Sequence, residues 1–204
     1  MKILLLNGNT DPGLTAGLAG KAELALKRMG VVGVDLVPAT ARFGARYIST
    51  RATATIAGHA VLDTLAERIG AANAEGFGAV AIACFGDPGL DAAKELCPVP
   101  VTGMAEASLS VAMRLAPRIA FLTGGEAWVP MLEEFCLLRG YGREHVLVRA
   151  VRPTGDMIAR APDAALAVLA ETARAAIDDG AEAVVLGGAG LAGLNSLLAL
   201  SLIH

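Results

Sequence analysis

Short apolar runs alternate with longer segments of helical periodicity along most of the chain. The first half contains the runs KILLL, VDLVP, AVAIAC and VPVTG, followed by helical patterns near residues 14–29, 53–75, 88–96 and 104–115. The second half contains RIAFLT, HVLVRAV and EAVVLGG, followed by helical patterns near residues 127–139 and 162–179 and from about residue 190. Apolar runs between helices are typical of parallel strands covered on both faces. The pattern therefore predicts an α/β fold built from doubly wound parallel sheets.

The two halves align as copies of one unit. EGFGAVAIAC lies over DGAEAVVLGG, which places Cys84 on Gly188, and KILLLNGNTD lies over RIAFLTGGEA. Ligands of open parallel sheets bind at the carboxyl ends of the strands. We therefore predict two similar lobes, residues 1–102 and 103–204, related by a pseudo-two-fold axis, with the active-site cleft between them. By the same alignment, the second lobe is expected to lack its last strand and helix.

Composition and charge narrow the classes of function. The 204 residues are 54% hydrophobic and only 4% aromatic, which suits packed layers of strands and helices. The net charge is −3 and the basic residues are scattered, so no nucleic-acid or membrane partner is expected. The chain has three cysteines, and this odd number favours a location in the reducing cytoplasm over a disulfide framework. A missing covering helix would leave apolar surface exposed, so we expect a homo-oligomer.

The cysteines differ in their sequence context. Cys84 ends a predicted strand, whereas Cys97 precedes a proline and Cys136 lies among leucines in a predicted helix. We therefore interpret Cys97 and Cys136 as structural. None of the three histidines has metal-ligand spacing with a carboxylate, so no metal site is expected.

Residues after Cys84 suggest how its thiol could be activated. Asp87 is a good N-cap and Pro88 suits the first helical position, so a helix should begin two or three residues after Cys84. The free N–H groups of that helix would favour a thiolate and lower the pKa of Cys84 below the ~8.5 of free cysteine. The alternative is a buried structural cysteine, which packs as a small apolar residue.

Four motifs carry a resemblance to a known family. They are NGNTD after the first strand, ACFGDPGLDAAKEL around Cys84, PVTGMAEAS, and LGGAGLAGL near the end of the chain. Together they resemble the aspartate/glutamate/hydantoin racemase superfamily, and within it the hydantoin and allantoin racemase branch. The resemblance covers most of the chain, and the segment around Cys84 is the most specific part.

The resemblance implies a cofactor-independent isomerase of amino acid metabolism. Two cysteines would flank the substrate Cα, one removing its proton and the other returning a proton to the opposite face. Cys84 would be one of them, but Gly188 stands at the position of the second. The substrate would be a small molecule, such as a hydantoin, with a carboxylate or ring carbonyl. The residues implied to hold it are Asn9, Thr10, Phe85, Gly86, Thr123, Gly124, Gly125, Ala189 and Gly190.

Two other functions stay open because only one thiol is present. A cofactor-independent decarboxylase of the arylmalonate type needs a single protonating cysteine, although that enzyme carries it in the second copy of the repeat. An inactive homologue that keeps an anion-binding cleft is the third reading. A racemase or epimerase, with water or another side chain replacing the second thiol, is the preferred prediction.

Overall fold

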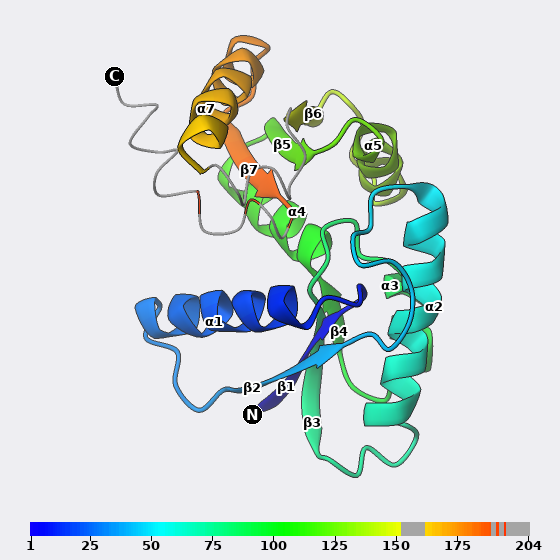
Figure 1. The fold of residues 1–204 in the computed structure, drawn as a ribbon. Coiled ribbons are helices and arrows are strands. Elements are labelled where there is room, and N and C mark those ends of the chain that lie inside the picture. Colours follow the sequence, from blue (N-terminus) through cyan, green and yellow to red (C-terminus); the bar gives the residue numbers. More distant parts are fainter. Residues whose placement is uncertain (152–161, 189–190, 192–193, 195–204) are drawn as a thin grey trace. The chain divides into compact units, whose positions relative to one another are not determined.

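The computed structural model describes residues 1–151 and 162–188, together with residues 191 and 194 (Figure 1). The chain divides into two compact units after Glu106, and each unit contains its own parallel sheet. The predicted α/β class is therefore confirmed. Ala189 and Gly190, two of the predicted substrate-binding residues, lie outside the described residues.

The first unit is built on a four-stranded sheet in the order β2-β1-β3-β4, with every neighbouring pair parallel. Its strands are β1 (Lys2–Asn7), β2 (Asp35–Thr40), β3 (Phe77–Ile82) and β4 (Val101–Gly103). Its helices are α1 (Pro12–Arg28), α2 (Arg51–Arg68) and α3 (Leu90–Leu96). A further helix, α4 (Met104–Leu115), begins in this unit and continues into the second.

The strand order contains a reversal of direction. From β1 the chain passes through α1 to β2 on one side, and then through α2 to β3 on the other side of β1. Right-handed crossovers in opposite directions place their helices on opposite faces of a sheet. Accordingly, α1 contacts β1 and β2, whereas α2 contacts β1 and α3 (Figure 1). The topological switch point of this sheet lies between β1 and β3.

Both ends of α2 have local causes in the sequence, and its end differs from the prediction. Helix α2 begins at a capping box, in which the Thr50 and Thr53 hydroxyls each accept the other residue's backbone N–H. The helical pattern over 53–75 is too long, since α2 ends at Arg68. Gly70 and Asn73 both have positive φ (53° and 43°), which a continuing right-handed helix does not permit.

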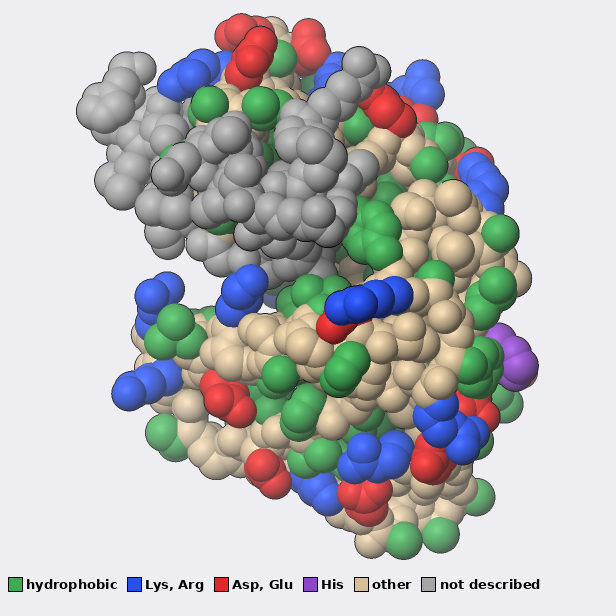
Figure 2. Space-filling model, in the orientation of Figure 1, with side chains coloured by type: hydrophobic (Ala, Val, Ile, Leu, Met, Phe, Trp, Pro, Cys, Tyr) green, Lys and Arg blue, Asp and Glu red, His purple; other side chains and the backbone are tan. Residues whose placement is uncertain are grey.

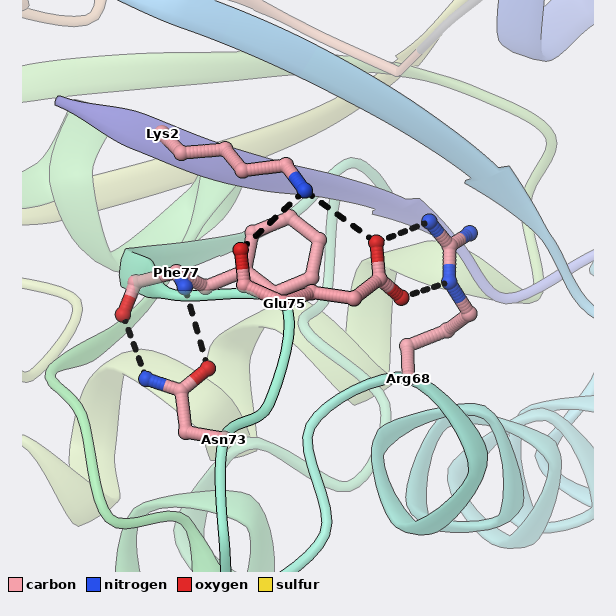
Figure 3. A network of polar contacts seen from close by, with 5 residues as sticks. All are labelled: Lys2, Arg68, Asn73, Glu75 and Phe77. Atoms are coloured by element: carbon pink, nitrogen blue, oxygen red, sulfur yellow. Dashed lines mark hydrogen bonds and ion pairs between the residues drawn. The ribbon is translucent and has the colours of Figure 1, made fainter.

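The loop after α2 is fastened to the amino ends of β1 and β3 by polar contacts (Figure 3). The carboxylate of Glu75 lies 3.2 Å from Lys2 Nζ and 2.9 Å from Arg68 Nε. Lys2 Nζ is also 4.5 Å from the ring centroid of Phe77, within cation–π range. The Asn73 side chain exchanges two hydrogen bonds with the backbone of Phe77, at 2.8 and 3.0 Å. This network lies at the amino ends of β1 and β3, opposite to the carboxyl ends of these strands.

The second unit contains a three-stranded parallel sheet in the order β6-β5-β7. Its strands are β5 (Ile119–Gly124), β6 (Val146–Val151) and β7 (Ala183–Gly187). Its described helices besides α4 are α5 (Trp128–Leu138) and α7 (Pro162–Asp178). All six residues of β5 are buried, as expected for the central strand of a sheet covered on both faces.

The two sheets repeat the same register as well as the same strand order. Ile3 pairs with Ala79 in the first sheet, and Ile119 pairs with Ala183 in the second. The alignment of the two halves places these two pairs on each other. The second sheet therefore has its own switch point, between β5 and β7. The pseudo-two-fold axis and the cleft stay predictions.

Figure 2 shows Lys and Arg side chains mixed with Asp and Glu side chains over most of the described surface on the face that it draws. Among the described helices, none combines the length and the apolar character needed to span a bilayer.

Candidate active site

The first unit brings two predicted site segments together at the switch point of its sheet. Strands β1 and β3 are adjacent, Leu6 pairs with Ile82, and the Ala83 N–H donates to the Leu6 carbonyl at 2.7 Å. Asn9 and Cys84 therefore follow neighbouring strands at the same edge of the sheet. Open α/β sheets bind their ligands outside the carboxyl ends of the strands at such a point.

The turn after β1 is held by a buried network of side-chain amides and hydroxyls. Asn7 Nδ2 donates to Asn9 Oδ1 at 2.7 Å and to Thr15 Oγ1 at 2.9 Å. The Thr15 oxygen also accepts from the Thr40 hydroxyl at 2.7 Å, which ties the turn to the end of β2. Asn9 Oδ1 accepts a second hydrogen bond from the Asp11 N–H at 3.0 Å. The carbonyl half of the Asn9 side chain is thus fixed from two sides.

The other half of the Asn9 side chain is left available. Asn9 is only 5% exposed, and no described residue accepts a hydrogen bond from its Nδ2. This donor is therefore open to water or to a ligand oxygen, which can accept its hydrogen bond. The neighbouring Thr10 uses its backbone N–H to donate to Ala45 O at 3.2 Å, so that group is already occupied.

The environment of Cys84 corrects the predicted activation of its thiol. Cys84 is half-buried and packs against the apolar core of the first unit. Burial, together with the nearby charge of Asp87, raises the pKa of Cys84 to about 12. The sequence-based expectation of a lowered pKa is wrong, because desolvation disfavours the thiolate and the nearest charge is negative. The resting side chain is a neutral thiol.

The predicted cap explains part of that error. Helix α3 begins at Leu90, later than expected, and its N-cap is Gly89 in a left-handed conformation (φ 77°), without a side-chain cap. Asp87 does not cap α3: its carboxylate accepts from the N–H groups of Ala105 and Glu106, at 2.9 and 2.7 Å, in α4. Between Cys84 and Asp87, Phe85 is buried and Gly86 has a φ of 114°. The turn is longer than the sequence indicated.

The second unit places its predicted site residues at its own switch point. Thr123 lies on β5 beside Gly187 of β7, so Gly124 and Gly188 follow at one edge of the sheet. Thr123 is 3% exposed, and among the described residues no hydrogen-bond partner of its hydroxyl is present. Gly125 and Gly188 have φ of 105° and 118°, a region that favours glycine. A Cβ built on Gly188 meets no atom of the described part of the chain within 4 Å.

The remaining cysteines and possible metal ligands lie elsewhere. Cys136 is buried in α5, where desolvation raises the pKa of its thiol to about 12, and Cys97 is half-buried at the end of α3. Within the described part of the chain, no three His, Cys, Asp or Glu side chains are grouped so that they could hold a metal ion.

Comparison with known proteins decides the family. The sequence profile described as Asp/Glu/hydantoin racemase matches residues 3–203. The chain belongs to the Asp/Glu/hydantoin racemase family. The resemblance drawn from the sequence motifs is therefore confirmed, and the chain is an isomerase of the racemase type.

Individual relatives agree with this assignment. The chain is 33% identical over 195 residues to the hydantoin racemase of Pseudomonas sp. (strain NS671), covering 94% of this chain and 74% of that one. It is 34% identical over 201 residues to the hydantoin racemase of Paenarthrobacter aurescens, covering 95% and 79%. Its fold is similar to that of allantoin racemase from Klebsiella pneumoniae, with a TM-score of 0.87 and 26% identity over 100% of this chain and 80% of that one.

The structure adds residues that the sequence analysis did not assign to the site. Asn7 and Thr15 orient Asn9, and Asp87 fastens the Cys84 turn to α4. The spacing of two residues between Asn7 and Asn9 at a strand end was an available signal, since such side chains can bond to one another. Nothing in the local sequence connects Asp87 to a helix that begins after β4.

Proposed function

We propose that this racemase acts on a hydantoin-like derivative of an amino acid, and that the Cys84 thiol carries a proton to and from Cα of the substrate. The observation that supports this most is the switch point between β1 and β3, because it lies between the strands that lead to Asn9 and Cys84. The names of the sequence relatives, hydantoin racemases, support the substrate class.

The proposed chemistry uses a thiol and a fixed hydrogen-bond donor. Cys84, as a thiolate, takes the proton from Cα, and the electron pair of the C–H bond moves into the adjacent carbonyl to form an enolate. Asn9 Nδ2 donates a hydrogen bond to that oxygen, which carries more charge in the enolate than in the carbonyl. A donor held in place before the reaction is worth most there, because it needs no reorganisation. Return of a proton to the opposite face completes the inversion, without a cofactor.

The raised pKa of Cys84 sets a condition on this scheme. A thiol with a pKa of about 12 is almost entirely protonated at neutral pH, so the base form is rare in the free enzyme. The same thiol is well suited to donate a proton to an enolate. With Gly188 at the second position, water or another side chain supplies the other proton transfer in our proposal.

That protonated thiol also favours a second candidate function, decarboxylation of an arylmalonate-like diacid. Loss of carbon dioxide breaks the C–C bond and leaves its electron pair in the enolate, so no base is needed. The S–H of Cys84 then protonates carbon, and the resulting thiolate recovers its proton from water.

Proton exchange in D2O distinguishes these functions. Single enantiomers of hydantoins, allantoin and free amino acids, together with arylmalonates, are incubated with the protein, and Cα deuteration is followed by NMR. Chiral chromatography of the same samples reports inversion, and samples without protein give the background rate. Deuteration with inversion supports the racemase, and carbon dioxide release supports the decarboxylase. Background rates across the whole panel contradict both.

Homo-oligomerisation and a cytoplasmic location stay predictions of the sequence.

A further inference from the structure

Asp87 is a buried carboxylate that joins three segments of the first unit. It is 4% exposed, and its backbone N–H donates to the Cys84 carbonyl at 3.0 Å while its own carbonyl accepts from the Leu90 N–H at 3.1 Å. Its side chain accepts from Ala105 N and Glu106 N at 2.9 and 2.7 Å. The turn that carries Cys84 is thereby connected to the start of α3 and to the first turn of α4.

The fold makes special room for this carboxylate. A Cβ built on Gly103, the last residue of β4, would lie 2.1 Å from the Asp87 Cγ and 2.2 and 2.5 Å from its two oxygens. No real Cβ approaches that closely, so any side chain at Gly103 would displace the Asp87 carboxylate. Asp87 also adopts a positive φ of 49°, which is uncommon for a residue other than glycine. Strained backbone persists where surrounding contacts over-determine it.

We propose that Asp87 is a positioning residue for the reaction of Cys84: it fixes the thiol-bearing turn against α4 through two charge-assisted hydrogen bonds. The inference rests on the proposed function, because Cys84 must be the group that moves the proton. Hydrogen bonds to an ionised carboxylate are among the strongest in proteins, so the turn has little freedom to shift. The negative charge also disfavours the thiolate, which keeps the proton on Cys84 in the resting protein.

Two variants perturb this contact in different ways. Asp87→Asn removes the charge but keeps the size of the side chain. Gly103→Ala keeps the charge but pushes the carboxylate away from α4. Thr50→Ala is the matched control, because it removes another helix-capping side chain, at α2, outside the proposed site. Circular dichroism and thermal melts verify that each variant folds.

Activity and thiol reactivity are measured separately. We expect Asp87→Asn and Gly103→Ala to lower kcat by an order of 10²-fold with little change in KM, since a misplacement of about 1 Å costs that much. In Asp87→Asn this loss should outweigh the gain from a larger thiolate fraction, whereas Gly103→Ala keeps the charge of Asp87. The double variant should be no slower than the slower single variant, because both break one contact. Thr50→Ala should keep the wild-type kcat.

Alkylation by iodoacetamide, resolved by peptide mass spectrometry, reports on Cys84 without any substrate. In Asp87→Asn, Cys84 should label several-fold faster near pH 8, about tenfold for each unit by which its pKa falls, while Cys97 keeps its rate. Wild-type kcat together with unchanged Cys84 labelling in Asp87→Asn would overturn the inference. If Asp87→Asn alone does not fold, the same two measurements on Gly103→Ala decide: a wild-type kcat there overturns the inference. Absence of turnover in the wild-type protein would instead refute the proposed function, and the labelling would still test the contact.

Discussion

Replacement of Gly188 by cysteine tests whether the missing thiol limits racemisation. Gly188 follows β7 at the position where the family resemblance places the second cysteine. Its φ of 118° is unfavourable for any residue with a Cβ, but the added Cβ has no neighbour within 4 Å among the described residues. The main cost of Gly188→Cys is therefore backbone strain, about 1–3 kcal/mol.

The expected gain exceeds that cost. A positioned acid or base contributes about 10²–10⁴-fold in rate, which corresponds to roughly 3–5 kcal/mol of transition-state stabilisation. The strain lowers the free energy of unfolding, but it does not raise the activation barrier of the reaction in the folded enzyme. For a chain of this size, it should lower Tm by about 2–4 °C per kcal/mol and leave the protein folded at 25 °C.

Gly188→Ala is the control, since it carries the same strain without a thiol. Both variants are melted by circular dichroism, and racemisation of a single-enantiomer hydantoin is followed by polarimetry at 25 °C. We expect similar Tm decreases in both variants and at least about 10²-fold faster racemisation in Gly188→Cys alone. A folded Gly188→Cys that racemises no faster than Gly188→Ala would refute the assignment of this position.

Three further predictions follow from the first unit. The kcat/KM of racemisation, corrected for the rate without enzyme, should keep rising with pH past ~8.5, because burial and Asp87 raise the pKa of Cys84 and the base form grows only in alkali; a plateau between pH 6 and 8 would contradict this. Asn9→Ala should lower kcat/KM by about 10²-fold, as expected for loss of an oxyanion donor, whereas an unchanged value in steady-state assays would remove Asn9 from the site. Glu75→Gln should flatten the dependence of Tm on acid pH. The Arg68 and Lys2 contacts lower the pKa of Glu75 to about 2, so the stabilisation by Glu75 is full above about pH 4.5 and is lost as pH falls toward 2. Equal acid profiles of the two proteins would count against that ion pair.

Hydrophobic periodicity predicts nearly all of the described elements. The pattern over 104–115 corresponds to α4, and the run KILLL corresponds to β1. These elements follow from local sequence, because the apolar period distinguishes buried strands from amphipathic helices. The error at the end of α2 also has a local cause, since the positive φ of Gly70 stops the helix within an otherwise helical pattern.

The site is predicted less completely because its geometry depends on contacts distant in sequence. Cys84 and Asn9 are suggested by their places after strands, and the sheet order brings those strand ends together. The partner of Asp87 could not be predicted, because a good N-cap residue can cap a helix other than the next one in the sequence. The space for its carboxylate beside Gly103 also exists only in the folded sheet. The direction of the Cys84 pKa shift was also missed, because burial of the thiol is its main cause and the charge of Asp87 adds to it.

Deuteration of the substrate Cα by the Cys84→Ser variant tests whether the Cys84 thiol moves the proton. Serine is close to cysteine in size, but its hydroxyl is a far weaker acid and is almost never ionised. Cys97→Ser serves as a control at the other half-buried cysteine. The rate of deuterium incorporation into a hydantoin in D2O is measured by NMR for the wild-type protein and both variants. We expect Cys84→Ser to lower this rate by at least about 10²-fold and Cys97→Ser to keep it. Wild-type deuteration in a folded Cys84→Ser protein would contradict the assignment of Cys84 as the group that moves the proton.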